Sequence, residues 1–111
     1  MALRWWGWGY EEIHYPLEKK PFLLPFLEER LGVKPQIVLP VPSLEEIELP
    51  PSRLGPEIRR EISRIVGEDN WSDSHRERLL HALGKSYVDL IRLRLRQVNA
   101  APDAVIFPEK E

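Results

Sequence analysis

The clearest periodic pattern of apolar and polar positions begins at Pro56. Apolar residues follow it at helical spacing and form one stripe: Ile58, Ile62, Ile65 and Val66. Charged residues occupy most of the positions between them, and Gly67 follows the last apolar residue. Proline favours the first turn of a helix and glycine the position just past its end. The pattern therefore predicts an amphipathic helix that begins at Pro56 and stops at Gly67.

Two further stretches have helical spacing. The first runs from about Pro25 to Leu31, with Gly32 as its C-cap, and its apolar residues are Phe22, Leu23, Phe26, Leu27 and Leu31. The second starts near Ser74, where Ser74 and Glu77 match a capping box, and Gly84 is expected to end it. Its apolar face consists of Leu79, Leu80 and Leu83. Both stretches are predicted to be short helices.

The stretch from Tyr87 to Val98 fits two structures. A helix face is formed by Tyr87, Leu90, Ile91, Leu95 and Val98, and Ser86 with Asp89 offers a helix start. Between positions 91 and 96, however, Ile or Leu alternates with Arg, which is typical of a strand. We favour the helix, because Leu and Arg are good helix formers and Ser86 caps it. The strand remains the alternative for 91–96.

The remaining segments are extended. Nine of the 11 prolines lie between Pro16 and Pro56, and proline removes a backbone donor and restricts the residue before it. The segment 33–52 therefore resembles a linker, with at most one short turn at Ser43 and Glu46. Ala104–Phe107 is β-prone but lacks an evident partner strand. The expected fold is mainly α: three to four short helices, a Pro-rich extended linker and a C-terminal β-prone segment, with no complete sheet of its own.

Three of the four tryptophans lie in the N-terminal segment 3–15. Such a cluster is typical of a membrane-interface anchor or of a platform on which bases stack. No cluster of Lys or Arg accompanies it, so we favour an irregular arm whose indole rings pack on another surface of the protein. We refer to this segment as the Trp-rich arm.

Composition excludes several classes of function. The net charge of -2 lacks the basic surplus of a nucleic-acid-binding domain, and the absence of cysteine excludes disulfides and thiol chemistry. We see neither a transmembrane segment nor a signal peptide, and we expect a cytoplasmic protein. Many prolines and charges, with no threonine and one Met, suggest a heat-adapted source.

Few residues suggest chemistry of their own. His75 and His81 are six positions apart, on different faces of a helix, and do not form a metal pair with each other or with His14. Adjacent carboxylates are expected to lie on solvated faces. A basic run, Arg92, Arg94 and Arg96 with Lys85 nearby, would grip phosphate only if it formed a strand. We therefore predict no catalytic, cofactor-binding or metal-binding residue.

Motifs spread along the chain resemble one protein family. They are the stretch from His81 to Arg94, the stretch from Ala101 to Pro108, the Trp-rich opening from Arg4 to Tyr10, and the segment from Leu49 to Ser52. Taken in chain order, they are similar to the N-terminal region of FAD-linked oxidases of the alkyldihydroxyacetone-phosphate synthase type. One departure is the stretch from Leu95 to Ala100, which lacks the glycine turn usual in the family, so the helix before it is expected to run on.

The resemblance implies a flavoenzyme that exchanges the acyl chain of acyl-dihydroxyacetone phosphate for a fatty alcohol, giving an ether-lipid precursor. The family's flavin loop and catalytic residues follow the strand at which this chain stops, so none can be assigned to a residue here. On this basis residues 1–100 are a helical N-terminal region, and residues 101–111 are the first strand and lead-in of an absent FAD-binding domain. FAD is implied for the full-length relative and not for this chain.

Two hypotheses follow. In the first, the chain is a structural region whose partner is the FAD-binding domain of the same or an adjacent polypeptide. In the second, it is a stand-alone helical interaction module that buries its Trp-rich arm in a partner or a second copy. In either case Trp5, Trp6, Trp8 and Ile106 are expected to be exposed and to drive self-association into a homo-oligomer.

Overall fold

The computed structural model describes residues 1–32, 34 and 40–110, and its fold is mainly α. The α-helices are α1 (Leu23–Leu31), α2 (Pro56–Val66), α3 (His75–Leu80) and α4 (Tyr87–Arg94). Single 3-10 turns are η1 (Leu17–Lys19), η2 (Leu44–Glu46) and η3 (Glu68–Asn70), and the strands are β1 (Trp71–Ser72) and β2 (Val105–Ile106). The expected fold class is confirmed. Part of the predicted linker, at 33 and 35–39, lies outside the described residues.

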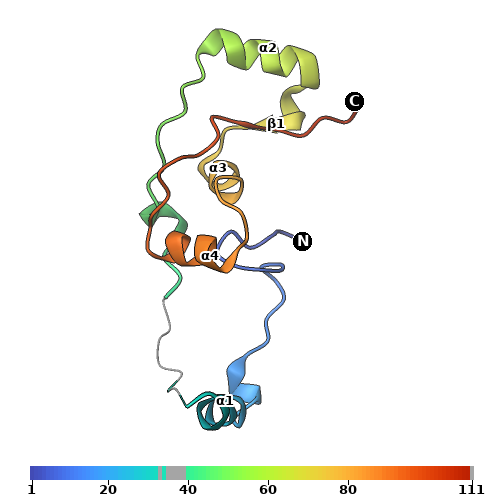
Figure 1. Cartoon of the computed structure of the whole chain (residues 1–111). Coiled ribbons are helices and arrows are strands. Elements are labelled where there is room, and N and C mark those ends of the chain that lie inside the picture. The colour runs from blue at the N-terminus through green and yellow to red at the C-terminus, as the bar shows by residue number, and fades with distance from the viewer. Residues whose placement is uncertain (33, 35–39, 111) are drawn as a thin grey trace.

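The molecule is elongated. Its principal extents are 59, 26 and 23 Å, and its radius of gyration is 18.5 Å. A compact domain of this length would have a radius of gyration of about 13 Å. Figure 1 shows α1 at one end, α2 at the other, and α3 and α4 between them, with two long extended segments running along the body. Such a shape leaves a large share of the side chains on the surface.

Most helix boundaries follow the predicted signals. Pro56 opens α2 and Gly67 follows it, while Ser74 and Ser86 accept hydrogen bonds from the backbone N–H groups of Glu77 and Asp89 at the starts of α3 and α4. The turn at η2 has the predicted capping box, in which the Ser43 N–H donates to Glu46 at 2.7 Å. The local sequence was therefore sufficient to place these starts.

Two boundaries differ from the prediction. Helix α1 begins at Leu23 rather than Pro25, which leaves the proline within the first turn, where its missing N–H is not needed. Helix α3 ends at Leu80 rather than near Gly84, because the chain tightens there into a turn in which the Ala82 N–H donates to the Leu79 carbonyl. Leu83 therefore follows α3 instead of extending its apolar face.

Helix α4 ends in a turn normally made by glycine. Its last residue is Arg94, so the strand alternative for 91–96 is wrong, and the expected extension of the helix is wrong as well. The Arg96 N–H donates to the Leu93 carbonyl and the Gln97 N–H to the Arg92 carbonyl, the two bonds of a Schellman motif. The motif requires a left-handed residue, and Arg96 supplies it with a φ of 58°. An arginine thus makes a turn for which glycine is the usual residue.

The β-prone tail has a partner that the sequence did not reveal. Strand β2 pairs antiparallel with β1, with Trp71 opposite Ile106 and Ser72 opposite Val105. The Phe107 N–H adds a hydrogen bond to the Asn70 carbonyl at 2.8 Å. Two residues are too few to give β1 a recognisable alternation of apolar and polar positions. In the described part of the chain, this pair is the whole sheet.

The core is small and lies in the middle of the molecule. Its buried apolar residues are Trp5, Ile47, Leu79, Leu93 and Val98, which come from the arm, the position just after η2, α3, α4 and the segment after α4. The apolar stripe predicted for α2 faces water to a large extent, since Ile58 and Ile65 are both more than half exposed. The core thus joins distant segments, while both ends of the molecule remain outside it.

Among the described residues, no helix has the length and apolar character needed to cross a membrane.

Candidate functional site

The Trp-rich arm is folded back on itself and partly buried. A bridge pairs Leu3 with Tyr10, and the Arg4 N–H donates to the Gly9 carbonyl at 2.9 Å. Trp5 is buried in the core, and Trp6 meets it edge to face with ring centroids 5.4 Å apart. The expected exposure of Trp5 is therefore wrong, because the core of this same chain buries it, and Trp6 is partly buried against that core.

Trp8 and Ile106 are exposed as expected. The Trp8 side chain is 62% exposed, and its Nε1 atom donates to the Lys85 carbonyl at 2.7 Å. Ile106 is close to half exposed. The arm therefore offers one accessible indole ring instead of three.

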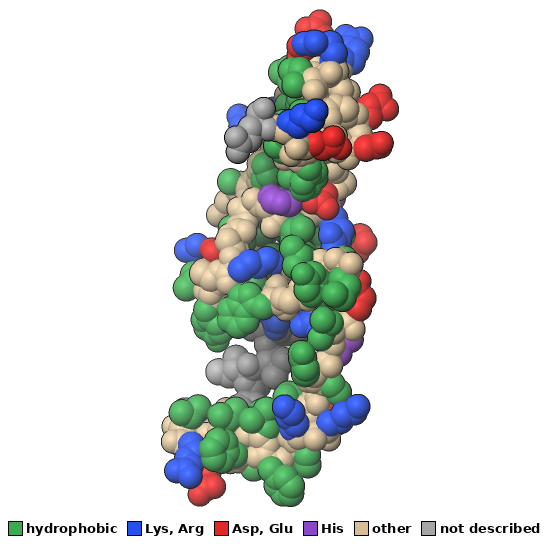
Figure 2. Space-filling view, turned by 90° about the vertical axis from the view of Figure 1, so that its right-hand side faces the viewer, with side chains coloured by type: hydrophobic (Ala, Val, Ile, Leu, Met, Phe, Trp, Pro, Cys, Tyr) green, Lys and Arg blue, Asp and Glu red, His purple; other side chains and the backbone are tan. Residues whose placement is uncertain are grey.

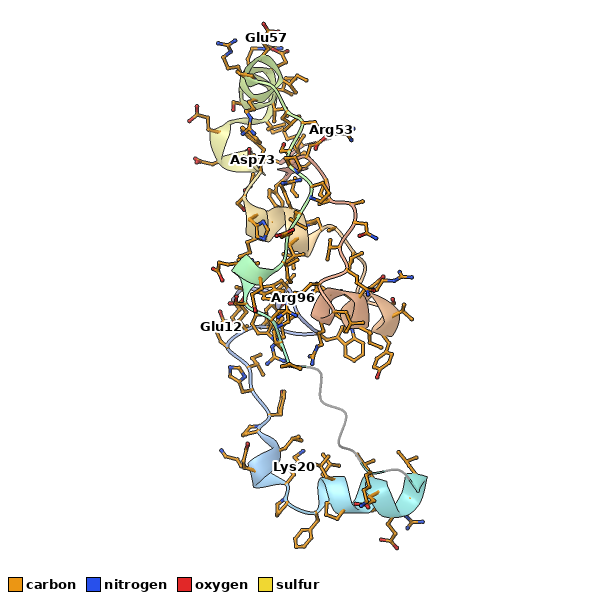
Figure 3. The ribbon with its side chains drawn as sticks, turned by 90° about the vertical axis from the view of Figure 1, so that its left-hand side faces the viewer. Glu12, Lys20, Arg53, Glu57, Asp73 and Arg96 are labelled. Carbon is orange, nitrogen blue, oxygen red and sulfur yellow. The ribbon has the colours of Figure 1, made fainter. Side chains whose placement is uncertain are left out.

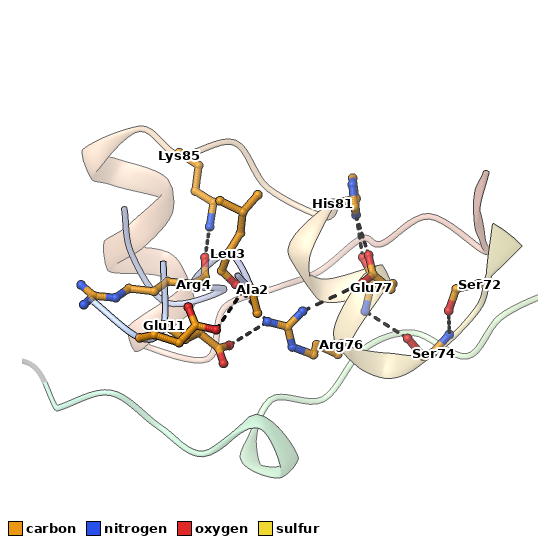
Figure 4. A network of polar contacts seen from close by, with 11 residues as sticks. Ala2, Leu3, Arg4, Glu11, Ser72, Ser74, Arg76, Glu77, His81 and Lys85 are labelled. Atoms are coloured by element: carbon orange, nitrogen blue, oxygen red, sulfur yellow. Dashed lines mark hydrogen bonds and ion pairs between the residues drawn. The ribbon is translucent and has the colours of Figure 1, made fainter. Parts of the chain in front are cut away.

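The Lys85 side chain also binds the backbone of the arm (Figure 4). Its Nζ atom donates to the Arg4 carbonyl at 2.5 Å and contacts the Gly7 carbonyl at 3.3 Å. Burial lowers the pKa of Lys85, and the positive charge of Arg76 lowers it further. Lys85 is thus engaged in holding the backbone of the arm.

Helix α3 contributes a second clamp. The Nη2 atom of Arg76 donates to the Leu3 carbonyl at 2.9 Å and to Oε1 of Glu11 at 2.7 Å. Figure 4 shows this arginine between Leu3 and Glu11 of the arm and Glu77 of its own helix. The arm is therefore tied to α3 and to the α3–α4 connection by polar bonds as well as by Trp5.

The buried arginine of α3 is a structural residue that the sequence analysis missed. Arg78 is 7% exposed, and it donates from Nε to the Pro102 carbonyl at 2.7 Å and from Nη2 to the Pro50 carbonyl at 2.5 Å. These carbonyls belong to the two extended segments that run along the body. Because its partners are backbone groups far away in sequence, no local pattern marks Arg78 among the other arginines.

The predicted basic run does not form a phosphate-binding face. Because the segment is helical up to Arg94, its guanidinium groups point in different directions. Arg92 lies 3.6 Å from Asp89, and Arg96 donates to Glu46 at 3.0 Å (Figure 3 labels Arg96). The interpretation of this run as a strand with one basic face is therefore wrong.

The three histidines lie apart. His75 Nε2 is 3.2 Å from the Leu44 carbonyl, His81 Nδ1 is 2.9 Å from the Glu77 carbonyl, and His14 is exposed. The His81 ring also meets Phe107 edge to face at 6.1 Å. Within the described ranges, no three His, Asp or Glu side chains lie close enough to hold a metal ion.

The most prominent exposed feature is the apolar surface of α1. We call it the α1 surface, and it consists of Phe22, Leu24, Phe26 and Leu31. Phe22 is 81% exposed, Phe26 52% and Leu31 65%, and no residue of α1 is buried. Figure 2 shows apolar side chains gathered over this end of the molecule. The geometry is that of a docking surface, and it includes no cluster of reactive groups.

Comparison with known proteins identifies long synthases, of which this chain matches a small part, and one protein of which it matches the larger part. The chain is 37% identical to alkyldihydroxyacetonephosphate synthase of Dictyostelium discoideum over 81% of this chain and 14% of that protein. It is 32% identical to the enzyme of the same name from Trypanosoma brucei brucei, over 96% of this chain and 20% of that protein. It is 33% identical to the protein Rv2250A of Mycobacterium tuberculosis, over 96% of this chain and 69% of that protein. No family model matches the chain.

Solved structures give the same result. Two structures of alkyldihydroxyacetonephosphate synthase superimpose on 98% of this chain, with TM-scores of 0.80 and 0.78 and 28% identity, and the match covers 24% and 23% of those chains. The elongated, mainly α segment is thus homologous to part of a larger synthase. The chain is similar over nearly its whole length to part of alkyldihydroxyacetonephosphate synthases. It spans between about a seventh and a quarter of the synthases it matches.

Proposed function

We propose that this chain is the N-terminal structural region of an alkyldihydroxyacetone-phosphate synthase-like, FAD-linked enzyme. The parent enzyme would make an ether-lipid precursor or carry out a related flavin oxidation. In this proposal the chain supplies packing surface, and the flavin and the catalytic residues belong to the FAD-binding domain of the same or an adjacent polypeptide.

The match to solved synthase structures carries this proposal. It extends over nearly the whole chain, so the elongated arrangement of the segments recurs in a protein about four times as large. An isolated domain is stabilised by burying apolar side chains. Here α1 and α2, the helices at the two ends of the molecule, leave apolar side chains exposed. Exposed apolar surface on a piece of a larger fold marks the places where the rest of the protein packs.

The C-terminal tail indicates where the FAD-binding domain would pack in this proposal. Residues 1–100 form the helical region, and residues 101–111 form the lead-in to the flavin domain. Strand β2 is paired on one side with β1, and both Ile106 and Phe107 remain about half exposed. We expect the other edge of β2 to meet the sheet of the FAD-binding domain, because an unpaired strand edge favours a further strand.

Titration of the purified chain with FAD tests the assignment of the flavin site. The visible spectrum and the fluorescence of the flavin should remain those of free FAD at all ratios. Tight, stoichiometric binding with a shifted flavin spectrum would overturn the proposal, because the chain would then contain a flavin site of its own.

The match to Rv2250A favours a second candidate. That relative is not a long enzyme with a short matching piece, since the alignment covers 69% of it. A region of this kind that works as a separate interaction module would join its partner through exposed Trp8 and the apolar ends, or form a homo-oligomer. Light scattering on the purified chain separates the two: a stable dimer that Trp8→Ala dissociates supports the module, and a monomer at high concentration contradicts it.

A further inference from the structure

Helix α1 stands apart from the small core, and nothing in the described chain accounts for its apolar side chains. It is nine residues long, and a helix of that length is marginal in water without tertiary packing. Phe22 and Leu31 at its two ends are among the most exposed apolar residues of the molecule. A helix that is retained with such a surface is expected to pack against something outside the described chain.

The charges around α1 indicate a protein as the occupant. A helix that lies on a lipid surface typically has Lys and Arg on its polar face. Within residues 18–31, three carboxylates (Glu18, Glu28 and Glu29) balance three cations (Lys19, Lys20 and Arg30), and Arg30 lies over the Phe26 ring at 5.5 Å. This segment therefore lacks the excess of positive charge that an anionic membrane attracts, whereas a protein groove accepts charges of both signs at its polar rim.

A second copy of the chain offers no suitable receptor in its best-defined hollows. One lies between the two extended segments and is lined by prolines, alanines and three polar residues, and the other is lined by Arg59, Arg60, Ser63, Arg64 and Glu68. Neither has a large aliphatic or aromatic side chain in its lining to receive two phenylalanine rings. The solved synthases, by contrast, match this chain over 98% of its length, and the match covers only 24% of the first of them, so most of that protein lies outside the matched part.

We infer that α1 is a docking helix whose Phe22 and Phe26 insert into an apolar groove on the flavin-binding portion of the parent enzyme. The inference rests on the proposed function and adds the specific contact. Anchors at i and i+4 lie on one face of a helix, which is the usual arrangement for a helix bound in a groove. Leu24 and Leu31 are also exposed, but at 3.6 residues per turn they lie on the opposite side of the helix and are not part of this face.

The test uses a full-length, FAD-loaded chimera. In the Dictyostelium synthase, the segment that matches this chain is replaced by residues 1–111, and trypsin cleavage after Lys19 and Arg30 is followed over time. Docking should slow this cleavage about tenfold or more relative to the isolated chain, because trypsin acts on the open form. Phe22→Gln with Phe26→Gln should restore fast cleavage in the chimera and leave the isolated chain unchanged.

Glu28→Gln is the matched control, since Glu28 is two positions from Phe26 and lies on another face of the same helix, so the change should leave protection intact. Gln is a better helix former than Phe, so the double variant preserves the helix itself. Flavin loading of the chimera separates the two proposals. A chimera that never accumulates with FAD overturns the proposed function together with the docking, whereas a loaded chimera with α1 as open as in the isolated chain overturns the docking alone.

Two measurements on the isolated chain address the other occupants. Light scattering that shows a dimer, dissociated by the double variant, would assign the α1 surface to a second copy. Co-sedimentation with vesicles of phosphatidylcholine and phosphatidylserine, lost in the double variant, would assign it to lipid. Either result would overturn the inference, and a monomer that leaves the vesicles in the supernatant supports it.

Discussion

The Nε atom of Arg78 donates a hydrogen bond to the carbonyl oxygen of Pro102 at 2.7 Å. The same guanidinium reaches the Pro50 carbonyl with its Nη2 atom. Arg78 is the one charged residue that is buried among the described residues. Burying a charge is costly unless its donors are satisfied, and the two hydrogen bonds to the extended segments offset that cost for Arg78. Through it, α3 holds the proline-rich segment and the tail side by side.

Arg78→Met should lower the free energy of unfolding by about 1–3 kcal/mol, because it keeps the apolar stem and removes both hydrogen bonds that the buried guanidinium donates to the Pro50 and Pro102 carbonyls. Urea unfolding followed by tryptophan fluorescence measures the change. Arg53→Met is the control: Arg53 is largely exposed and 3.9 Å from Asp103, so its loss should cost less than about 0.5 kcal/mol. Equal effects of the two variants would contradict the role given to Arg78.

The Trp-rich arm should respond unequally to two chemically identical substitutions. Trp5→Leu should cost about 2–3 kcal/mol, since it leaves part of a buried indole volume unfilled. Trp8→Leu should cost less than about 1 kcal/mol, because Trp8 is exposed and loses one hydrogen bond to the Lys85 carbonyl. Urea unfolding of the two variants gives both values. A larger effect at Trp8 would mean that the arm is anchored by its tip rather than by the core.

Local signals in the sequence were sufficient for the helices. Pro56 and Gly67 bound α2, and the hydroxyls of Ser74 and Ser86 begin α3 and α4, because capping acts within three or four residues. The class of protein followed from motifs in the same way. Features that depend on residues only a few positions apart were therefore predictable from the sequence.

The contacts between distant segments were not predictable from the same windows. The partner of β2 is only two residues long, Arg78 bonds to carbonyls that any residue possesses, and the burial of Trp5 depends on Ile47 and Leu93. The apolar stripe of α2 was recognised as part of an amphipathic helix, but the periodicity did not show whether another surface covers the stripe, and in the structure much of it is exposed. The α1 surface, identified in the structure, presents the same question of what it packs against.

Arg96→Gly should stabilise the chain, although it removes an ion pair. Arg96 has a φ of 58°, which costs a residue with a side chain about 1 kcal/mol relative to glycine. Its exposed ion pair with Glu46 contributes less than that. The gain should be about 1 kcal/mol when Arg96→Gly is introduced into Glu46→Gln, where the ion pair is already absent.

Arg92→Gly tests the same residue change inside α4. That position has ordinary helical backbone, so glycine there should destabilise by about 1 kcal/mol. Thermal and urea unfolding of the three variants provide the comparison. A loss of stability in both glycine variants would show that the left-handed conformation of Arg96 is not strained.

The carboxylate of Glu46 should make stability depend on pH in the acidic range. The Ser43 N–H, first, and Arg96, second, hold the pKa of Glu46 below its ordinary value of 4.5. The folded chain therefore binds this proton less readily than the unfolded chain does. The stabilisation from the ionised carboxylate is complete above pH 4.5 and is lost as the pH falls through the folded-state pKa. Wild type should accordingly exceed Glu46→Gln in free energy of unfolding at about pH 7, and the difference should shrink by about pH 3.

The two causes can be separated by titrating the Glu46 carboxyl by NMR in the Arg96→Gly variant. The ion pair is gone there, but the hydrogen bond from the Ser43 N–H remains, so the pKa should rise toward 4.5 without reaching it. A return to the full ordinary value would mean that Arg96 alone lowers the pKa. In that case the capping box at Ser43 would contribute nothing to the charge state of Glu46.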